Sequence, residues 1–396
     1  MNTAQKRLLI LGFTVLLTLF ACLSAYGQAS SPTERYVFYA DAFNGLYFLY
    51  APEPGKWTDG HTGPGPNPIG SMTVVNSATV VEFDYINSNE VADIGGGNLS
   101  GWGGGCPSCV GAPAPAPGST LTSFVDASGP VRHVFYEGTN GHVYELYCFC
   151  NSVGATWHWD DPTSLARGAP LAASGSALTS FIDNGVMHVF YLGTNANVYE
   201  LYWTGGTAWH SDNPTSLAGA PAAASVGSLT SFIDGSGIMH VFYLSGQNVH
   251  ELYWNGVWHT DDATSQAGAP LNASGSALTS FVNITGKGDT GMHVMYLGTN
   301  EHVYALHSTS SPAWGYFDAT AASGGVPVVS GGKLTSFQDT VTGGVRLYFI
   351  GQNAHVYELY WPSEGAASET DLTTASSASE TAATGSALAG VMMPPN

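Results

Sequence analysis

Short apolar runs separated by turn residues recur along the chain. The tetrad "LTSF" begins at Leu121, Leu178, Leu229, Leu278 and Leu334. Each copy is followed by a second run such as "MHVFYL", a turn such as "GTNAN", a third run such as "VYELYW" and a segment such as "WHSD". Short apolar runs bounded by Gly and Asn are typical of strands and hairpins. Each unit therefore predicts four antiparallel strands.

Four strands in a repeat of about fifty residues are the signature of a β-propeller blade, so the predicted fold is all-β. The repeat units lie near residues 35–60, 71–110, 119–167, 176–218, 227–267, 276–322 and 332–374. The first unit lacks an inner strand, and residues 386–392 copy only the opening of a unit. A ring of seven blades, closed by the C-terminal strand pairing into the first blade, explains both facts and removes an exposed sheet edge. A six-bladed ring is the alternative.

Composition fits this fold and restricts the partner. Of the 396 residues 44% are hydrophobic and only 10% are charged, and Gly is abundant, which suits short strands and tight turns. The formal net charge is −20 and Lys and Arg together number nine. Nucleic acids and anionic membrane surfaces require clustered basic residues, so both are disfavoured and a neutral partner is expected.

The N-terminal segment predicts export. Residues 1–27 combine the basic Lys6 and Arg7 with an apolar run and small residues at Ala25 and Gly27, as a secretory signal peptide does. Residues 28–396 are expected to form a single propeller domain, secreted, periplasmic or held at the cell surface. A lipoprotein signal with Cys22 as the lipidated residue is the alternative. No other apolar run is long enough to insert into a membrane.

Four cysteines follow the signal segment: Cys106, Cys109, Cys148 and Cys150. An even number in an oxidising compartment predicts two disulfides, whose pairing the sequence leaves open. A four-thiolate zinc site is the alternative. The motifs "WHWDD", "WHSD" and "WHTDD" place His and Asp two residues apart, but a polar outer strand explains them, so neither a metal nor a cofactor is predicted.

A basic residue opens the second strand of several units and a glutamate follows on the third strand. The pairs are His133 with Glu145, His188 with Glu200, His240 with Glu251 and Arg346 with Glu358. On hairpin-paired strands this spacing brings a donor near an acceptor, and a charged pair can bind neighbouring hydroxyls by short hydrogen bonds. Tryptophans near the end of each unit offer a flat apolar wall that the less polar face of a sugar ring can cover.

The arrangement resembles the fucose-specific lectin family, propellers of fungi and bacteria whose repeats read as an inner strand, "RVYYQ", a turn, a glutamate and then tryptophans. The resemblance extends from Arg35 to Met392. It implies that the basic residue and the glutamate bind the sugar and that aromatics of the following blade complete each pocket. The implied pockets are Arg346 and Glu358 with Trp57; His188 and Glu200 with Trp254 and Trp258; His133 and Glu145 with Trp203 and Trp209; and His240 and Glu251 with Trp314.

The units differ in how well they match that family. Arg346 keeps the arginine, so its pocket is predicted to be the best, whereas histidine, with fewer donors, replaces it in the other three. In the sixth unit His293 faces Ala305 instead of a glutamate, and this junction is predicted not to bind. Packing alone could explain the histidines and tryptophans, but a repeated buried carboxylate implies a repeated partner.

The predicted function is that of a carbohydrate-binding lectin with several inter-blade sites, with glycans as partners and fucose or a related monosaccharide as the leading ligand. A protein-interaction scaffold without a sugar site is the alternative, and a glycoside hydrolase is a further one. Hydrolysis requires an asymmetric pair of carboxylates, whereas the acidic residues here recur once per blade. We therefore expect a binding protein and not an enzyme.

Overall fold

The computed structural model describes residues 34–392 except 42–44, 54–55, 62–70, 78–79, 87–89, 97–102, 127–130, 150–155, 207, 225–226, 284–290, 309–312, 340–341, 363–365, 379 and 384. The predicted signal peptide, Cys22 and Cys150 lie outside these residues. Over the described ranges, no helix has both the length and the apolar character needed to cross a bilayer.

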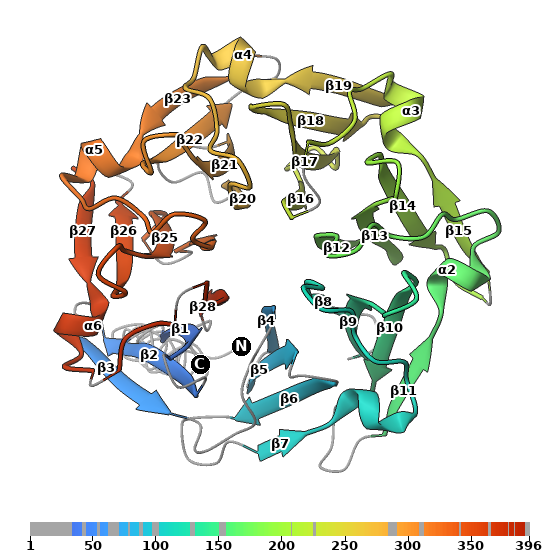
Figure 1. Cartoon of the computed structure of the whole chain (residues 1–396), viewed down its shortest axis with the longest axis horizontal. Helices are drawn as coiled ribbons and strands as arrows, with labels where there is room; N and C mark the ends of the chain where they lie inside the picture. Colours follow the sequence, from blue (N-terminus) through green and yellow to red (C-terminus); the bar gives the residue numbers. More distant parts are fainter. Residues whose placement is uncertain are drawn as a thin grey trace, which may run out of the picture.

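Seven four-stranded antiparallel sheets are arranged around a central axis, which confirms the seven-bladed propeller (Figure 1). Blade 1 contains β28 (Leu388–Met392), β1 (Arg35–Ala40), β2 (Leu46–Glu53) and β3 (Lys56–His61); blade 2 contains β4 (Met72–Ser77), β5 (Val80–Ile86), β6 (Val91–Gly96) and β7 (Gly103–Gly105); blade 3 contains β8 (Thr122–Asp126), β9 (Val131–Glu137), β10 (Val143–Cys148) and β11 (Trp157–Asp160).

The remaining blades follow the same order from the axis outward. Blade 4 contains β12 (Leu178–Asp183), β13 (Val186–Leu192), β14 (Val198–Trp203) and β15 (Trp209–Asp212); blade 5 contains β16 (Leu229–Ile233), β17 (Met239–Ser245), β18 (Asn248–Trp254) and β19 (Trp258–Asp262); blade 6 contains β20 (Leu278–Asn283), β21 (Gly291–Leu297), β22 (Val303–Ser308) and β23 (Gly315–Asp318); blade 7 contains β24 (Leu334–Gln338), β25 (Val345–Ile350), β26 (Val356–Trp361) and β27 (Ser368–Asp371).

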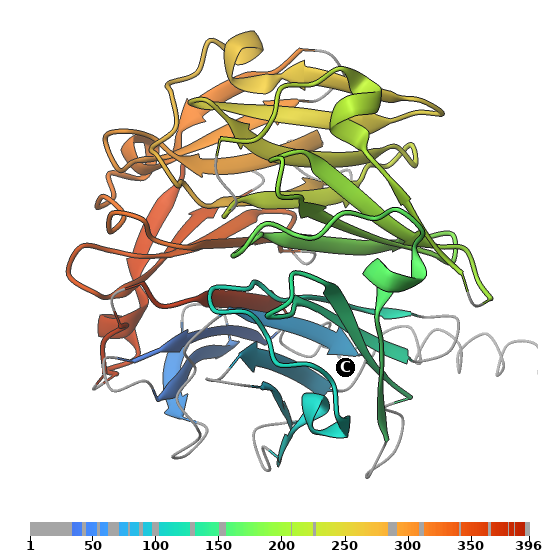
Figure 2. The same cartoon turned by 45° about the vertical axis from the view of Figure 1, so that its right-hand side comes forward.

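Short helices lie at the rim of the ring (Figures 1 and 2). They are the 3₁₀ turn η1 (Pro107–Val110) and the helices α2 (Pro162–Leu165), α3 (Pro214–Ala218), α4 (Ala263–Ala267), α5 (Ala319–Ser323) and α6 (Leu372–Ala375). The side chains of Asp161, Asn213 and Asp262 cap α2, α3 and α4 by accepting a backbone N–H. This capping explains why a polar residue recurs just after the "WH" motifs.

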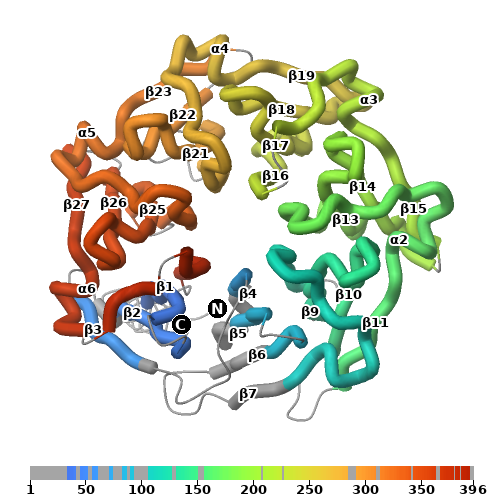
Figure 3. The backbone as a smooth tube through the Cα atoms, viewed as in Figure 1, coloured from blue at the N-terminus to red at the C-terminus, as the bar shows by residue number. Residues whose placement is uncertain are grey.

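The two ends of the propeller meet in blade 1. Strand β28 pairs antiparallel with β1, with Tyr36 opposite Val391 and Phe38 opposite Ala389. The tube in Figure 3 shows the C-terminal strand beside the first strand of the ring. The predicted closure is confirmed, and it gives seven blades rather than six.

The inner strands are joined by a belt of hydroxyl groups, which explains why "LTSF" repeats. Threonine and serine of successive blades are hydrogen-bonded in the pairs Thr73–Ser123, Thr122–Ser180, Thr179–Ser231, Thr230–Ser280 and Thr279–Ser336, at 2.7–2.9 Å. In blade 1, Ala389 and Gly390 stand at these positions, and Thr335 Oγ1 instead accepts the Gly390 N–H at 3.3 Å. Each bond contributes about 0.5–1.5 kcal/mol, so the belt fixes the register of the blades around the axis.

The second strands form the core because both of their faces are covered by neighbouring blades. In β13, Met187, Val189 and Tyr191 pack against blade 3, whereas Phe190 and Leu192 pack against blade 5. A strand sandwiched in this way is continuously apolar rather than alternating, as the "HVFYL" runs are. Alternate residues of each second strand therefore face the previous and the next blade.

The cysteines agree with the expected disulfides in part. Cys106 and Cys109 form a disulfide beside η1, with their Cα atoms 5.2 Å apart. Cys148 is also disulfide-bonded. Because these sulfurs are used in disulfides, Cys106 and Cys109 are not thiolate ligands, and the four-thiolate zinc alternative is wrong.

Removing the closing strand tests the ring directly. A chain ending at residue 384 lacks β28, so the edge of β1 is exposed. It also lacks Leu388, which leaves the core residues that pack against this side chain uncovered. We expect its melting temperature to fall by roughly 5 °C or more, since several kcal/mol of pairing and packing are lost. A chain ending at residue 392 retains β28 and is the control, with an unchanged melting temperature. Equal melting temperatures for the two truncations would contradict the role of closure.

Candidate ligand-binding site between blades

The basic residue and the glutamate of blade 4 are diagonal neighbours on one face of the sheet. Phe190 lies opposite Glu200 and His188 lies opposite Tyr202 in the register of β13 and β14. His188 Nδ1 and Glu200 Oε1 are 2.5 Å apart. The two side chains are nearly buried, with 7% of His188 and 3% of Glu200 exposed. The spacing of twelve residues thus places a donor and an acceptor in direct contact.

Blades 3 and 5 contain the same contact. The Nδ1–Oε1 distance is 2.6 Å for His133 and Glu145 and 2.5 Å for His240 and Glu251. Burial raises the pKa of Glu145 and of Glu200, and the hydrogen bond and charge of the paired histidine lower it in part. The histidine is therefore the partner that a repeated buried carboxylate requires.

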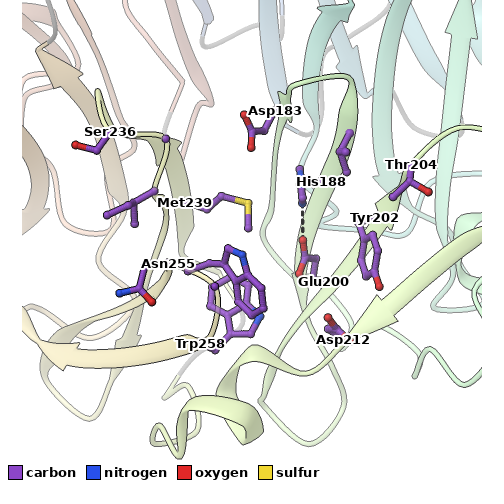
Figure 4. A pocket seen from close by; sticks show the side chains of 15 residues that line it. Asp183, His188, Glu200, Tyr202, Thr204, Asp212, Ser236, Met239, Asn255 and Trp258 are labelled. Atoms are coloured by element: carbon purple, nitrogen blue, oxygen red, sulfur yellow. Dashed lines mark hydrogen bonds and ion pairs between the residues drawn. The ribbon is translucent and has the colours of Figure 1, made fainter.

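A cavity of about 650 Å³ lies between blades 4 and 5, where His188 and Glu200 face Trp258 (Figure 4). Blade 4 and the segments around it contribute Asp183, Val186, His188, Glu200, Tyr202, Thr204 and Asp212, and blade 5 with its loops contributes Ser236, Gly237, Ile238, Met239, Trp254, Asn255, Gly256 and Trp258. The structure thus brings together all four residues expected at this junction.

The tryptophans have two roles at this junction. Trp258 is only 6% exposed and its ring packs edge-on against Phe190 at 6.1 Å, so it is part of the inter-blade core. Trp254 is partly buried, and its ring centroid lies 5.5 Å from that of Trp258 at an angle of 56°. Both rings also line the cavity. Trp258 therefore packs in the inter-blade core and also lines the cavity, with Trp254 beside it.

The junctions on either side are built in the same way. Between blades 3 and 4, Trp209 packs edge-on against Phe135 at 6.1 Å, and Trp203 lies beside the same apolar cluster. Between blades 5 and 6, Trp314 packs edge-on against Phe242 at 5.7 Å. Phe135 and Phe242 follow His133 and His240 by two residues, so the tryptophans lie on the face that carries each histidine.

The junction of blades 7 and 1, predicted to hold the best pocket, contains an additional arginine. Arg346 donates to Glu358 at 2.8 Å and to Asp339 through Nε at 2.9 Å and a terminal nitrogen at 2.8 Å. Arg35, from blade 1, donates to the same Glu358 oxygen at 2.9 Å, and its guanidinium lies 5.0 Å from the centre of the Trp57 ring. Arg346, Glu358 and Trp57 are thus brought together, with Arg35 in contact with the glutamate and the tryptophan.

The polar groups of this junction are largely satisfied within the protein. Glu358 Oε1 also accepts the Tyr348 hydroxyl at 2.8 Å. Burial raises the pKa of Asp339, but hydrogen bonds from Thr342 and Arg346 outweigh that effect and hold the pKa below its usual value. Two arginines and two carboxylates therefore form a buried ionic network that joins the last blade to the first. We rank the cavity beside His188 above this junction as a ligand site.

Arg35 occupies a repeated position whose residue differs between blades. In blades 3 to 7 this position immediately precedes the basic residue of the second strand. It is occupied by Arg132 in blade 3, Met187 in blade 4, Met239 in blade 5, Met292 in blade 6 and Val345 in blade 7. This residue faces the previous blade, as Met239 does in the cavity. Arg132 likewise pairs with the buried Asp84 of blade 2. An arginine here joins two blades, and a methionine leaves an apolar wall.

The junction predicted not to bind lies between blades 6 and 7. His293 stacks on Phe281 with ring centroids 4.9 Å apart, and Ala305 is fully buried where blades 3, 4, 5 and 7 have a glutamate. The carboxylate that would orient a ligand is missing from this position. His293 is therefore suitable as a control in binding experiments.

Sequence reasoning missed several residues of the cavity, namely Asp183, Tyr202, Asp212, Met239 and Asn255. A signal for Asp183 was available, because the same position after "LTSF" is acidic in Asp126, Asp234 and Asp339. In two blades that acid lies near the basic residue: Asp339 binds Arg346, and Asp234 lies 3.6 Å from His240 Nε2. The repeat thus contains a second carboxylate beside each of these basic residues.

Comparisons with known proteins identify the fold. No protein-family model and no curated protein matches the chain. A solved lectin from Burkholderia pseudomallei is similar over 86% of this chain and 95% of its own, with 14% identity and a TM-score of 0.67. A mutant of AofleA from Arthrobotrys oligospora covers 82% and 90%, with 13% identity and a TM-score of 0.53. The fucose-specific lectin from Aleuria aurantia covers 76% and 93%, with 13% identity and a TM-score of 0.50.

At these identities the similarity establishes the architecture. The chain has the β-propeller fold of these lectins, and the resemblance inferred from the repeats is confirmed at this level. What the lectins bind is a property of those proteins, and the ligand of this chain has to be argued from its own junctions.

The ionic network can be tested by a double-mutant cycle. Arg35→Met gives blade 1 the residue found in blades 4 to 6 and removes a bond to a buried carboxylate, which should lower the free energy of unfolding by about 3 kcal/mol. Glu358→Gln and the double variant complete the cycle, measured by chemical denaturation. We expect a coupling energy above about 1 kcal/mol between the two positions. A coupling near zero would show that Arg35 does not stabilise ring closure through Glu358.

Proposed function

We propose that the protein is a carbohydrate-binding lectin with several sites between its blades, and that fucose or a related monosaccharide is the leading ligand. The observation that carries the proposal is the cavity between blades 4 and 5, in which a histidine–glutamate pair of one blade faces two tryptophans of the next. Polar groups opposite an aromatic wall match the two faces of a sugar ring.

The dimensions of the cavity support a small ligand. Its volume of about 650 Å³ lies within the range of roughly 300–1,000 Å³ that is usual for small-molecule sites. His188, Glu200 and the two tryptophans are held by the sheets themselves and not by loops. A site built on rigid strands binds a ligand with little cost of ordering.

The repetition of the junction supports a lectin in particular. We propose as ligand-binding the residues His133, Glu145, Trp203, Trp209, His188, Glu200, Trp254, Trp258, His240, Glu251 and Trp314, with Arg346, Glu358 and Trp57 as the most altered junction. Several weak sites on one molecule gain strength on a clustered glycan. The similar solved proteins include lectins, one of them fucose-specific, and the proposal agrees with them.

We further propose that the protein is exported and acts by binding alone. The disulfide between Cys106 and Cys109 is compatible with an oxidising, extracellular environment, as a signal peptide in residues 1–27 would require. Its partners would be glycans or glycoconjugates, without nucleic acid or membrane insertion. The carboxylates of the cavity make an assay of glycoside hydrolysis a necessary part of any test.

Binding to a glycan array, followed by titration of the best ligand, tests this proposal. Trp258→Ala and Glu200→Gln should each weaken binding at the junction of blades 4 and 5 at least about 10-fold, since each removes a wall or a charge that orients the sugar. Because the other junctions are unchanged, the titration should show this as a fall in the number of sugars bound per chain. Glu200→Gln should not lower the free energy of unfolding at pH 7, because burial raises the pKa of this carboxyl and its charged form is disfavoured in the folded state.

His293→Ala is the control, and its affinity should equal that of the unaltered protein. The absence of any glycan from the bound set would favour the protein-interaction scaffold. Turnover of an aryl glycoside by the unaltered protein would favour the hydrolase.

A further inference from the structure

The His188–Glu200 pair presents unused acceptors to a ligand in the cavity between blades 4 and 5. His188 Nδ1 is engaged with Glu200, so a neutral ring that donates through Nδ1 has an acceptor at Nε2. Within the described part of the chain, neither His188 Nε2 nor the second oxygen of Glu200 makes a hydrogen bond. Both side chains are more than nine-tenths buried and line the cavity.

Two more carboxylates face the same cavity. Asp212 lies directly opposite Glu200 in the register of β14 and β15, and Asp183 lies at the end of the inner strand. Asp183 accepts one bond, from the Asn184 side chain at 2.8 Å, and retains its second oxygen. The described lining residues include three carboxylates, one histidine and neither Lys nor Arg. The cavity is therefore negatively charged whether or not His188 is protonated.

The opposite wall also favours a cation. Trp254 and Trp258 form an angled pair of rings, and Met239 lies beside them (Figure 4). The face of an indole ring attracts a cation, and the attraction grows when the site excludes water. A ligand between the two walls would contact carboxylates on one side and aromatic faces on the other.

The junction of blades 7 and 1 shows the opposite balance. There, Arg35 and Arg346 neutralise Glu358 and Asp339, and all four side chains are buried. In the junction of blades 4 and 5, Met239 stands in place of Arg35 and His188 in place of Arg346, while both acids are kept as Asp183 and Glu200. Compared with the junction of blades 7 and 1, the cavity therefore lacks the two arginines but has both carboxylates.

We infer that the cavity between blades 4 and 5 binds a sugar that carries a free amino group, with the ammonium directed at Glu200 and Asp212, which lie opposite one another on β14 and β15. This inference rests on the proposed lectin function and specifies its ligand. An ammonium offers three donors and a positive charge, which matches a site of acceptors and carboxylates. The sugar ring fills a volume larger than an ammonium alone requires and covers the tryptophans.

Calorimetric titration of the full mature chain tests the charge preference, with glucosamine, N-acetylglucosamine, glucose and fucose as probes. The first three share one ring and differ at a single carbon. We expect glucosamine to bind at least about 10-fold more tightly than the acetylated or hydroxyl form, and the ratio to shrink as salt is raised. Tetramethylammonium is the fourth comparison, since it has the charge without the sugar, and it should bind more weakly than glucosamine.

Neutralising single acids locates the preference. Asp212→Asn should reduce the ratio of glucosamine to glucose affinity by about 5-fold or more, because it removes a charge that faces the ammonium. Asp183→Asn, three strands away on β12, should reduce the ratio less. Glu301→Gln, which removes a negative charge outside the cavity, should leave the ratio unchanged. Melting curves of all three variants show whether each is folded, and a second acid variant is available if one is not.

The outcomes separate the two proposals. Equal affinities for glucosamine and glucose would overturn the inference of an amino sugar and leave the lectin intact. Binding of tetramethylammonium at least as tight as that of glucosamine would also overturn it, since the sugar ring would then contribute nothing. Failure to bind any sugar, here and on a glycan array, would overturn the lectin itself.

Discussion

Every site between the blades depends on the pairing of β28 with β1. The width of each junction is set by the angle between neighbouring sheets, and that angle is fixed only when the last sheet shares its inner strand with the first. The hydroxyl belt transmits this constraint from one inner strand to the next. Because alternate residues of the second strands face opposite neighbours, a closed ring brings a basic residue of one blade against tryptophans of the following blade.

The residue at one repeated position distinguishes the ionic junctions from the cavity between blades 4 and 5. Where this position holds an arginine, the side chain pairs with a carboxylate of the previous blade and the junction contains a buried ionic contact. Arg35 with Glu358 and Arg132 with Asp84 are the two examples. Where it is Met239, the acid remains available and a cavity is present. The network of two arginines and two carboxylates lies at the closure, where the ring has only a non-covalent connection between chain ends. The repeated glutamate thus contributes to ring closure as Glu358 and lines the cavity as Glu200.

The sequence was sufficient for the fold because the repeat is local. Strand order and the diagonal contact of His188 with Glu200 follow from spacing within one unit, and the number of blades follows from the count of units and the C-terminal copy of their opening. The role of Arg35 could not be read in this way, since Glu358 is 323 residues away and the two meet only through ring closure. Asp183 and Met239 were missed for a related reason: periodicity shows that a position repeats, but not which neighbouring blade its side chain faces.

Charge explains why the histidine junctions retain a costly acid. Burial raises the pKa of Glu200, so the folded protein disfavours the carboxylate form, and His188 offsets this effect only in part. A neutral sugar would leave that imbalance in place, because hydroxyls carry no compensating charge. A cationic ligand would supply the charge that Arg35 and Arg346 supply in the closure junction. The same interaction would favour the ionised form of Glu200, so stabilisation of the acid and recognition of the ligand are one electrostatic effect.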